Sequence, residues 1–417
     1  MYCKSTLSNG LRVVSEAIPY VKSATVGIWV GTGSRNEHEY NHGISHFLEH
    51  LMFKGTDNRS ARDIAETVDA VGGQLNAFTA KEYTCYYMKV LDTHVDLAMD
   101  ILSDMLLASK FGAEDINRER EVVLEEVNMY EDSPDELVHD LFLNNVWPSH
   151  PLGRNILGTT DSIAKFDRDL VLEYYRDFYT PDNIVIAAAG NITHAQIEKL
   201  ADKFFGGMKG SKKQQITTPP ELQPVRIIRA KETEQVHLCL GTASMPYNSP
   251  DVYVLHVLNN ILGGGISSRL FQSIREERGL AYSIYSYTTS YSDCGLFTVY
   301  AGTRPANVGE VVDLVMKNIK EIKSIGITKN ELTKTKEQLK GSLLLGLESS
   351  SSRMSRLGKM EITLGKFTTL DEIVASIEKV NLDSAGRILE NMFNDNNLCF
   401  TAIGAVASTD LPQVFKE

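Results

Sequence analysis

The two halves of this sequence repeat one another, and this repetition limits the folds that the chain can adopt. NIVIAAAG at 183–190 resembles NLCFTAIG at 397–404, and the two segments are 214 positions apart. GAEDINRE, which opens at Gly112, matches GITKNELT at Gly326 with the same offset. THVDLAMDIL and ANVGEVVDLV match at an offset near 213. An offset that stays nearly constant over three separate elements is hard to obtain by chance, so the sequence predicts duplicated domains of about 210 residues.

Strand-like and helix-like segments are mixed in each half, which predicts an α+β fold. LRVVSEA and SATVGIWVGTG are rich in Val and Ile with the partial alternation typical of strands. SARDIAETVDAVGG has the pattern of an amphipathic helix, with Ser60 as a plausible N-cap and Gly72 as a plausible stop. We therefore expect two duplicated domains, each a mostly antiparallel sheet packed with helices.

A boundary between the domains is expected near the middle of the chain. The segment KGSKKQQITTPPELQP has few apolar residues, two adjacent prolines and a basic cluster. This composition is typical of a linker. The sequence thus predicts a first domain over 1–209, a linker over 210–224 and a second domain over 225–417.

The run NHGISHFLEHLMFKGT contains the pattern H-x-x-E-H at His46, Glu49 and His50. On an α-helix these positions crowd onto one face, where two imidazoles one turn apart can bind one zinc ion with the carboxylate beside them. The pattern is the inverted form of a known zinc-peptidase signature. Burying three ionisable groups in so apolar a segment is costly unless a metal or other partners satisfy them. A pair of His with a nearby Glu also occurs by chance on many solvated helices.

A second helix downstream supplies more carboxylates. AEDINREREVVLEEVNMYED keeps its apolar residues at roughly helical spacing. Glu119 and Glu126 are seven positions apart and share one face, whereas Glu125 lies on a different face. Glu is a good helix former, so any single Glu here has an ordinary structural explanation. Only the combination with the H-x-x-E-H helix makes Glu126 a candidate third ligand.

The second half has not kept these residues. It has VLHVLNNILGGGISSRLF where the first half has its metal helix, and Lys340 stands opposite Glu126. We therefore expect one metal ion per chain, in the first domain. The Gly-rich stretch lacks the Lys and the spacing of a phosphate-binding loop, so we interpret it as a turn between helices.

Composition limits the cellular compartments and the classes of ligand that are expected for this chain. The longest apolar runs of the 417 residues are far shorter than the ~20 residues of a membrane helix, and the first residues do not resemble a secretory signal. Five scattered cysteines, an odd number, argue against a disulfide framework and favour reduced thiols in a cytoplasm. The net charge of −12 disfavours nucleic acid and favours cationic ligands, although acidity for solubility alone explains it equally well.

These features together resemble the pitrilysin/insulinase family of inverted zinc peptidases, and most of all its short bacterial members related to the β subunit of mitochondrial processing peptidase. The resemblance covers essentially the whole chain and implies a processing-peptidase-like fold, of the LuxS-like metalloenzyme class. It rests on the following stretches: HGISHFLEHLMFKGT, GGQLNAFTAKEYTCYY, EREVVLEEVNMYEDSPDE, GGGISSRLFQSIREERGLAYSIYSY and EQLKGSLLLGLESSSSRMSR.

The resemblance implies a role for each matched residue. His46, His50 and Glu126 match the zinc ligands, and Glu49 matches the catalytic base that activates a water held at the metal. Glu119 matches a second carboxylate that supports the ligands. The edge strand that pairs with the substrate backbone is matched by Asn76, Ala77 and Phe78. An Arg/Tyr pair that the second half contributes to the bound peptide is matched by Arg275 and Tyr282.

The implied activity is that of a zinc metalloendopeptidase acting on unfolded peptides or presequence-like segments. Long family members close four such domains around a chamber, whereas this chain has two, so the resemblance implies a homodimer with a composite active site. Two alternatives stay open, both without catalysis: a core subunit of an assembly, or a peptide-binding partner of a separate catalytic subunit. Relatives of the core type lose the metal motif, which is present in full here. The physiological substrate and the cleavage preference do not follow from the sequence.

Overall fold

The computed structural model describes residues 2–213, 217–393 and 397–407, and the chain divides into two compact units. The described parts of 1–128, 155–217 and 344–368 form the first unit. The second unit comprises the described parts of the rest of the chain: 129–154, 218–343 and 369–417. Residues 214–216 of the predicted linker lie outside the described residues.

The first unit is built on one six-stranded sheet in the order β1-β2-β6-β3-β5-β4. Its pairs are antiparallel except for β2 with β6, which is parallel. The elements of this unit, including the start of α4, are β1 (Tyr2–Thr6), β2 (Arg12–Ala17), β3 (Ser23–Val30), α1 (Ile44–Leu51), α2 (Ala61–Ala70), β4 (Gln74–Thr79), β5 (Thr84–Leu91), α3 (Val95–Ala108), α4 (Ala113–Glu131), α6 (Thr160–Ile163), α7 (Arg168–Phe178), β6 (Ile184–Gly190), α8 (His194–Phe205) and α12 (Ser350–Leu364).

The second unit repeats this arrangement around a five-stranded sheet in the order β7-β11-β8-β10-β9. Again one pair, β7 with β11, is parallel and the others are antiparallel. The elements of this unit, including most of α11, are α5 (Pro134–Val146), β7 (Arg226–Ala230), β8 (Val236–Ser244), α9 (Val252–Gly263), a π-helix (Phe271–Glu276), β9 (Ala281–Ser290), β10 (Gly295–Thr303), α10 (Val308–Ile325), α11 (Lys329–Gly346), α13 (Leu370–Lys379), α14 (Leu382–Met392) and β11 (Cys399–Gly404).

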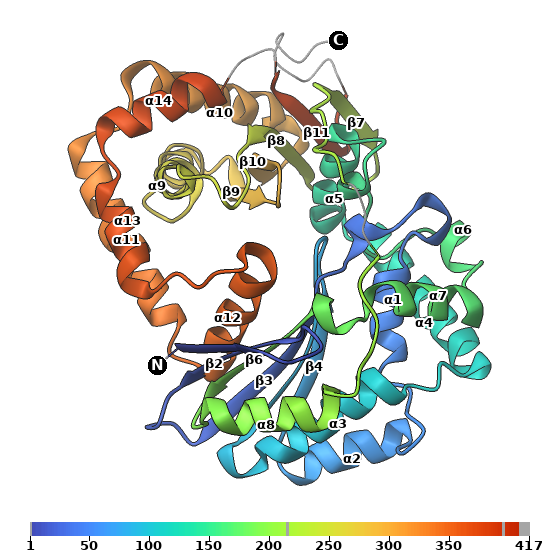
Figure 1. Ribbon diagram of the computed structural model, residues 1–417. Helices are drawn as coiled ribbons and strands as arrows, with labels where there is room; N and C mark the ends of the chain where they lie inside the picture. The colour runs from blue at the N-terminus through green and yellow to red at the C-terminus, as the bar shows by residue number, and fades with distance from the viewer. Residues whose placement is uncertain (1, 214–216, 394–396, 408–417) are drawn as a thin grey trace. The chain divides into compact units, whose positions relative to one another are not determined.

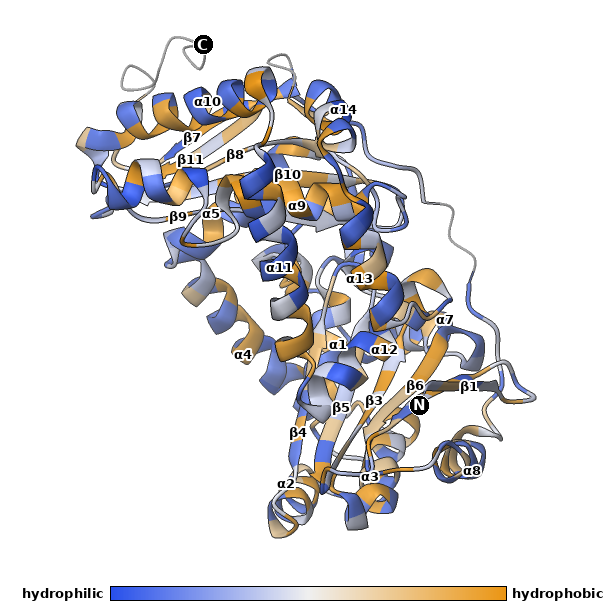
Figure 2. Ribbon diagram, turned by 90° about the vertical axis from the view of Figure 1, so that its left-hand side faces the viewer, coloured by the Kyte–Doolittle hydropathy of each residue, from blue (hydrophilic) through white to orange (hydrophobic). Residues whose placement is uncertain are grey.

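The matching strand orders confirm the predicted α+β fold with two mostly antiparallel sheets. Strand β6 is buried along its whole length, because β2 and β3 flank it and helices cover both faces of the sheet. Figure 1 shows α3 and α8 on one face of this sheet and α12 on the other. In Figure 2, hydrophilic and hydrophobic residues alternate along helices such as α10, as expected for helices with one buried face.

Each sheet is covered on its second face by a helix from the other half of the sequence. Helix α12 packs on β2, β3 and β6 of the first sheet, where Met354 contacts the indole of Trp29 at 3.4 Å. A side chain at Gly358 would collide with that indole, since an added Cβ would lie 2.1 Å from it. In the second unit, α5 packs on β8 and β11. Because of this exchange, 129–154 of the predicted first domain (1–209) belongs to the second compact unit, and 344–368 of the predicted second domain (225–417) belongs to the first. The predicted domains follow the sequence repeat, whereas the compact units follow spatial contacts, so the domain boundaries stay a prediction.

Candidate metal centre

Helix α1 carries the H-x-x-E-H residues, and its start is fixed by a buried carboxylate, Glu37, that was not predicted from the sequence. Gly43 begins the helix in the left-handed region, with φ 95°, which favours glycine. Glu37 accepts hydrogen bonds from the backbone N–H groups of Gly43 and Ser45 at 2.8 and 2.9 Å. Burial raises the pKa of Glu37 to about 7, against these hydrogen bonds, which lower it. The carboxylate therefore orients the helix by satisfying N–H groups that would otherwise lack partners.

The remaining residues of α1 anchor it to the core. Ile44, Phe47 and Leu48 are fully buried in the main hydrophobic cluster of the first unit. Because these residues hold the opposite side of the helix, His46, Glu49 and His50 turn together towards α4 and β4.

The imidazoles of His46 and His50 converge with the carboxylate of Glu126 from α4. Their Nε2 atoms lie 3.7 and 3.6 Å from Glu126 Oε2, and the candidate ligand atoms of the three residues lie within 4.8 Å of one another. These separations are too long for ordinary hydrogen bonds. They are close to the ~3.4 Å expected between ligands placed tetrahedrally at zinc–ligand distances of about 2.0–2.1 Å. Among the described residues, this is the one group of three His, Cys, Asp or Glu side chains spaced to hold a metal ion.

The state of His46 suits a metal ligand. Burial, and secondly the charge of His50, lowers the pKa of His46 to about 3, so the ring is neutral at physiological pH. The neutral imidazole is the form that coordinates a metal. Its Nδ1 is buried without a hydrogen-bond partner among the described residues. The residues present therefore fit a zinc ion, and the cluster could bind one metal.

Glu119 lies behind His50, where it supports the ring. His50 Nδ1 donates to Glu119 Oε2 at 3.2 Å, which leaves the Nε2 lone pair facing Glu126. The other oxygen of Glu119 forms an ion pair of 2.6 Å with Lys54. Glu119 is buried, so both contacts satisfy a carboxylate that would otherwise be costly to hold. A carboxylate in this position orients a ligating histidine and makes it more basic.

Glu49 is held by the end of strand β4. Thr79 Oγ1 donates a hydrogen bond of 2.5 Å to Glu49 Oε2. Burial raises the pKa of Glu49, and the Thr79 hydrogen bond opposes that shift. Neither Thr79 nor Lys54 was predicted from the sequence. The available signal for Thr79 was strand alternation, because it follows Ala77 by two positions and shares its face of the strand.

The predicted substrate strand is β4, which contains Asn76, Ala77 and Phe78. It is the last strand in its sheet and pairs with β5. Asn76 is exposed, and its side-chain oxygen accepts from the N–H of Ala77 at 2.8 Å. The ring of Phe78 packs edge-on against Trp29 with centroids 5.6 Å apart. These residues thus lie on a sheet edge, anchored by one aromatic side chain.

Arg275 and Tyr282 lie together in the second unit. Arg275 is in the π-helix, and Tyr282 is in β9 with 75% of its surface exposed. The guanidinium carbon lies 5.3 Å from the centre of the Tyr282 ring and 4.9 Å from that of Phe271. The structure therefore brings this predicted pair together, as it does separately for the metal cluster, Glu119 and Glu49 in the first unit.

Helix α11 of the second unit corresponds to α4 in the sequence repeat. Its described residues contain no cluster comparable to that of His46, His50 and Glu126. Lys340 of α11 pairs with Glu337 at 2.6 Å and with Glu378 at 2.5 Å. The ammonium group of Lys340 thus stands at the position that matches Glu126 in the sequence repeat. All five cysteines are free thiols. No helix in the described ranges combines the length and the apolar character needed to cross a bilayer.

Comparison with known proteins places the chain among peptidases. Residues 12–160 match the model of Insulinase (Peptidase family M16), and 165–339 match that of the Peptidase M16 inactive domain. The chain is 47% identical to a Bacillus subtilis protein named as the uncharacterized zinc protease YmxG, over 95% of this chain and 97% of that protein. It is 43% identical to an uncharacterized zinc protease of Streptomyces coelicolor, over 93% and 86% of the two chains.

Two solved structures share the fold. A protease from Helicobacter pylori has a TM-score of 0.91 at 24% identity, over 97% of this chain and 99% of that chain. A peptidase M16 inactive domain from Pseudomonas fluorescens has a TM-score of 0.90 at 19% identity, over 98% of each chain. The sequence matches span nearly the whole chain, and they agree with the resemblance stated from its motifs. This chain belongs to the insulinase family of peptidases, family M16.

Proposed function

We propose that this chain is a zinc metalloendopeptidase that hydrolyses peptide bonds in extended or unfolded peptides, including presequence-like segments. The observation that carries this proposal is the convergence of His46, His50 and Glu126, with Glu49 on the same helix face. The names of the relatives, which are zinc proteases, support zinc as the metal. We assign the inverted H-x-x-E-H motif as the metal-binding helix of the enzyme.

His46, His50 and Glu126 would hold the zinc ion, and Glu119 would orient His50. When bound, zinc supplies a Lewis acid that polarises the scissile carbonyl and lowers the pKa of water towards ~7. Glu49 then accepts a proton from the attacking water and returns it to the leaving amine. Its position one residue before His50 keeps it on the side of the helix where the ligands converge.

Thr79 positions the Glu49 carboxylate, so its loss is expected to reduce turnover. Replacing Thr79 with Val removes the donor at constant shape, and we expect kcat to fall by roughly tenfold, the effect of losing one hydrogen bond to a charged group. Thr79→Ser keeps the hydroxyl and should restore most of the rate. Steady-state cleavage of a quenched fluorescent peptide measures both variants. A fall in kcat that Ser does not rescue would mean that packing at β4, and not the hydrogen bond, causes the effect.

The β4 edge is the proposed substrate-binding strand. An extended peptide can add itself to an exposed sheet edge through main-chain hydrogen bonds, which demand little of its sequence. Asn76, Ala77 and Phe78 would make this contact, and Arg275 and Tyr282 would donate to a peptide carbonyl or the developing oxyanion. The net charge of −12 favours basic peptides, as in presequence-like segments.

Removal of the metal tests the proposal directly. We expect the purified protein to contain about one zinc per chain and to cleave an unfolded peptide. Chelation should abolish cleavage, and one equivalent of zinc should restore it; manganese or cobalt are alternative metals for reconstitution. Metal-free protein that never hydrolyses peptides would favour the alternative, a non-catalytic core or peptide-binding subunit. The match of 165–339 to an inactive domain keeps that alternative open for the second half.

We further propose a homodimer in which each zinc site is completed by Arg275 and Tyr282 of the other copy. Mixing Glu49→Gln protein with Arg275→Ala protein should then recover activity, because a mixed dimer contains one site with both intact halves. Each variant alone serves as the control. An activity of the mixture no greater than that of the two separate variants would place the whole site in one chain. The five free thiols make a reducing compartment, the cytoplasm, the proposed location.

A further inference from the structure

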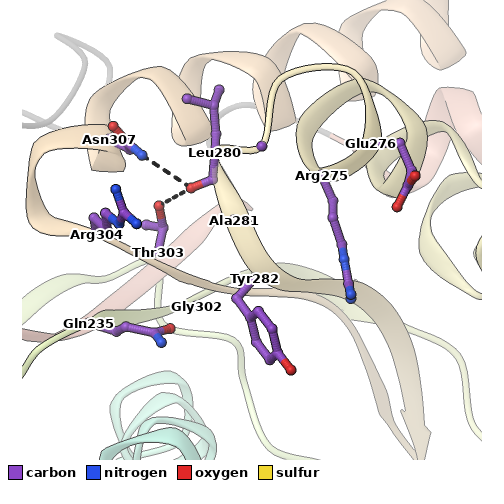
Figure 3. Close-up of a pocket in the computed structure, with 11 residues that line it drawn as sticks. Gln235, Arg275, Glu276, Leu280, Ala281, Tyr282, Gly302, Thr303, Arg304 and Asn307 are labelled. Atoms are coloured by element: carbon purple, nitrogen blue, oxygen red, sulfur yellow. Dashed lines mark hydrogen bonds between the residues drawn. The ribbon is translucent and has the colours of Figure 1, made fainter.

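A cavity of about 480 Å³ opens at one end of the second sheet, where β9 begins and β10 ends. Its wall includes Arg275, Tyr282, Gln235, Arg304 and Asn307. Figure 3 shows Arg275 and Arg304 on either side of the first residues of β9, with Gln235 below them. The ladder between β9 and β10 shifts register between Gly302 and Thr303, at this same end.

The described lining of the cavity carries more positive than negative charge, with two arginines and one glutamate. Neither Arg275 nor Arg304 forms an ion pair with any of the described residues, and Arg304 is exposed. Glu276 is the one acidic side chain in the described lining. In Figure 3 it projects from the π-helix on the far side of Arg275 from Arg304. Two guanidinium groups in one cavity, neither of them ion-paired within the part of the chain that the structure describes, stand out in a sequence with 54 acidic and 42 basic residues.

Neighbouring contacts restrain Arg275 and the backbone turn that carries Arg304. The guanidinium of Arg275 is stacked near the Phe271 and Tyr282 rings, which limits its freedom before a ligand arrives. Thr303 and Asn307 both donate to the Leu280 carbonyl, at 2.5 and 3.4 Å, and so brace the turn that carries Arg304. Gly302 leaves room for Gln235, because a Cβ there would lie 3.2 Å from the Gln235 side-chain oxygen.

We propose that this cavity is a subsite for a peptide carboxylate, in which Arg304 forms the ion pair and the Gln235 amide assists. An arginine fork matches the two oxygens of a carboxylate, and such charge-assisted pairs are stronger than neutral hydrogen bonds. The source is either the free C-terminus of a peptide or an Asp or Glu side chain, since both present the same group. The inference rests on the proposed peptidase function, whose substrates are peptides. It adds that a basic peptide should also present one carboxylate to this subsite.

Binding of four labelled peptides to full-length, zinc-loaded Glu49→Gln protein tests the subsite without turnover. The peptides share one basic sequence and differ in one group: a C-terminal acid, a C-terminal amide, an amide with one internal Glu, and the same amide with Gln. We expect the acid, or the Glu peptide, to bind roughly tenfold tighter than its neutral counterpart by fluorescence anisotropy, with a smaller difference at high salt. A preference within the acid and amide pair identifies the C-terminus as the source of the carboxylate, and a preference within the Glu and Gln pair identifies a side chain.

Arg304→Gln, added to the Glu49→Gln protein, should make the affinity for the acidic peptide nearly equal to that for its neutral counterpart. Arg304→Lys, which keeps the charge but not the fork, should retain part of the preference for the acidic peptide. The matched control is Arg278→Gln, because Arg278 is an exposed arginine of the preceding turn that does not line the cavity. Equal binding of all four peptides, no binding of any, or a preference that survives Arg304→Gln overturns the inference. Failure of the proposed function is seen separately, as the absence of cleavage by the unsubstituted protein.

Discussion

Glu49→Gln is expected to lower kcat/KM for an unfolded peptide by about 10²–10⁴-fold, the usual contribution of a general base. Gln has the size of Glu but cannot accept a proton from water. It can still accept the hydrogen bond from Thr79 through its amide oxygen, so the local packing should persist. Zinc content should stay near one per chain, because Glu49 is not among the three converging ligands. Peptide cleavage and metal analysis on the same preparation give the two readouts.

The matched control is Glu125→Gln, a carboxylate of α4 that is exposed and outside the cluster. It makes the same chemical change close to the site in sequence and should leave cleavage unchanged. A Glu49→Gln protein that still cleaves at the original rate, with zinc bound, would remove Glu49 as the base. Loss of zinc along with activity would instead assign Glu49 a part in holding the metal.

The two histidines of the candidate metal cluster could be predicted to lie together, because helical spacing fixes their positions. His46 and His50 are one turn apart on α1, and their convergence depends on the helix alone. Glu126 was a candidate only in combination with the H-x-x-E-H helix, and the family resemblance then matched it to the third ligand. Spacing along α4 alone offers several glutamates, and tertiary packing selects among them. The fold was predictable for a similar reason: the repeat at constant offset implies two copies of one arrangement, which the two strand orders confirm.

The contacts that support the site were not predictable from local patterns. Glu37 reaches the start of α1 from a preceding turn, Lys54 reaches Glu119 from the residues after α1, and Thr79 reaches Glu49 from β4. Each contact joins side chains whose distance is set by how elements pack, and sequence periodicity carries no information on that. The exchange of α5 and α12 between the two sheets is of the same kind, since each helix covers a buried apolar sheet face formed by strands far from it in the sequence.

Substitutions of Glu126 and Glu119 should differ in how they affect the zinc affinity and the stability of the metal-free protein. Glu126→Ala removes a proposed ligand, and we expect the zinc affinity to fall by more than the about 10–100-fold typical of losing a supporting residue. Its side chain is 43% exposed, so the metal-free protein should unfold at nearly the same denaturant concentration as before. Competition with a chromogenic chelator measures the affinity, and denaturant unfolding of the metal-free protein measures the stability.

Compared with Glu126→Ala, Glu119→Gln should lower the zinc affinity less and the stability of the metal-free protein more. Its zinc affinity should fall only by about 10–100-fold, because His50 remains but is less firmly oriented. Its metal-free form should be less stable, because Glu119 is buried and its loss leaves the Lys54 ammonium without its 2.6 Å partner. Glu121→Gln, at an exposed position of the same helix, should change neither quantity. If Glu119→Gln lost zinc more completely than Glu126→Ala, the roles assigned to the two carboxylates would have to be exchanged, and the ion would lie on the Glu119 side of His50.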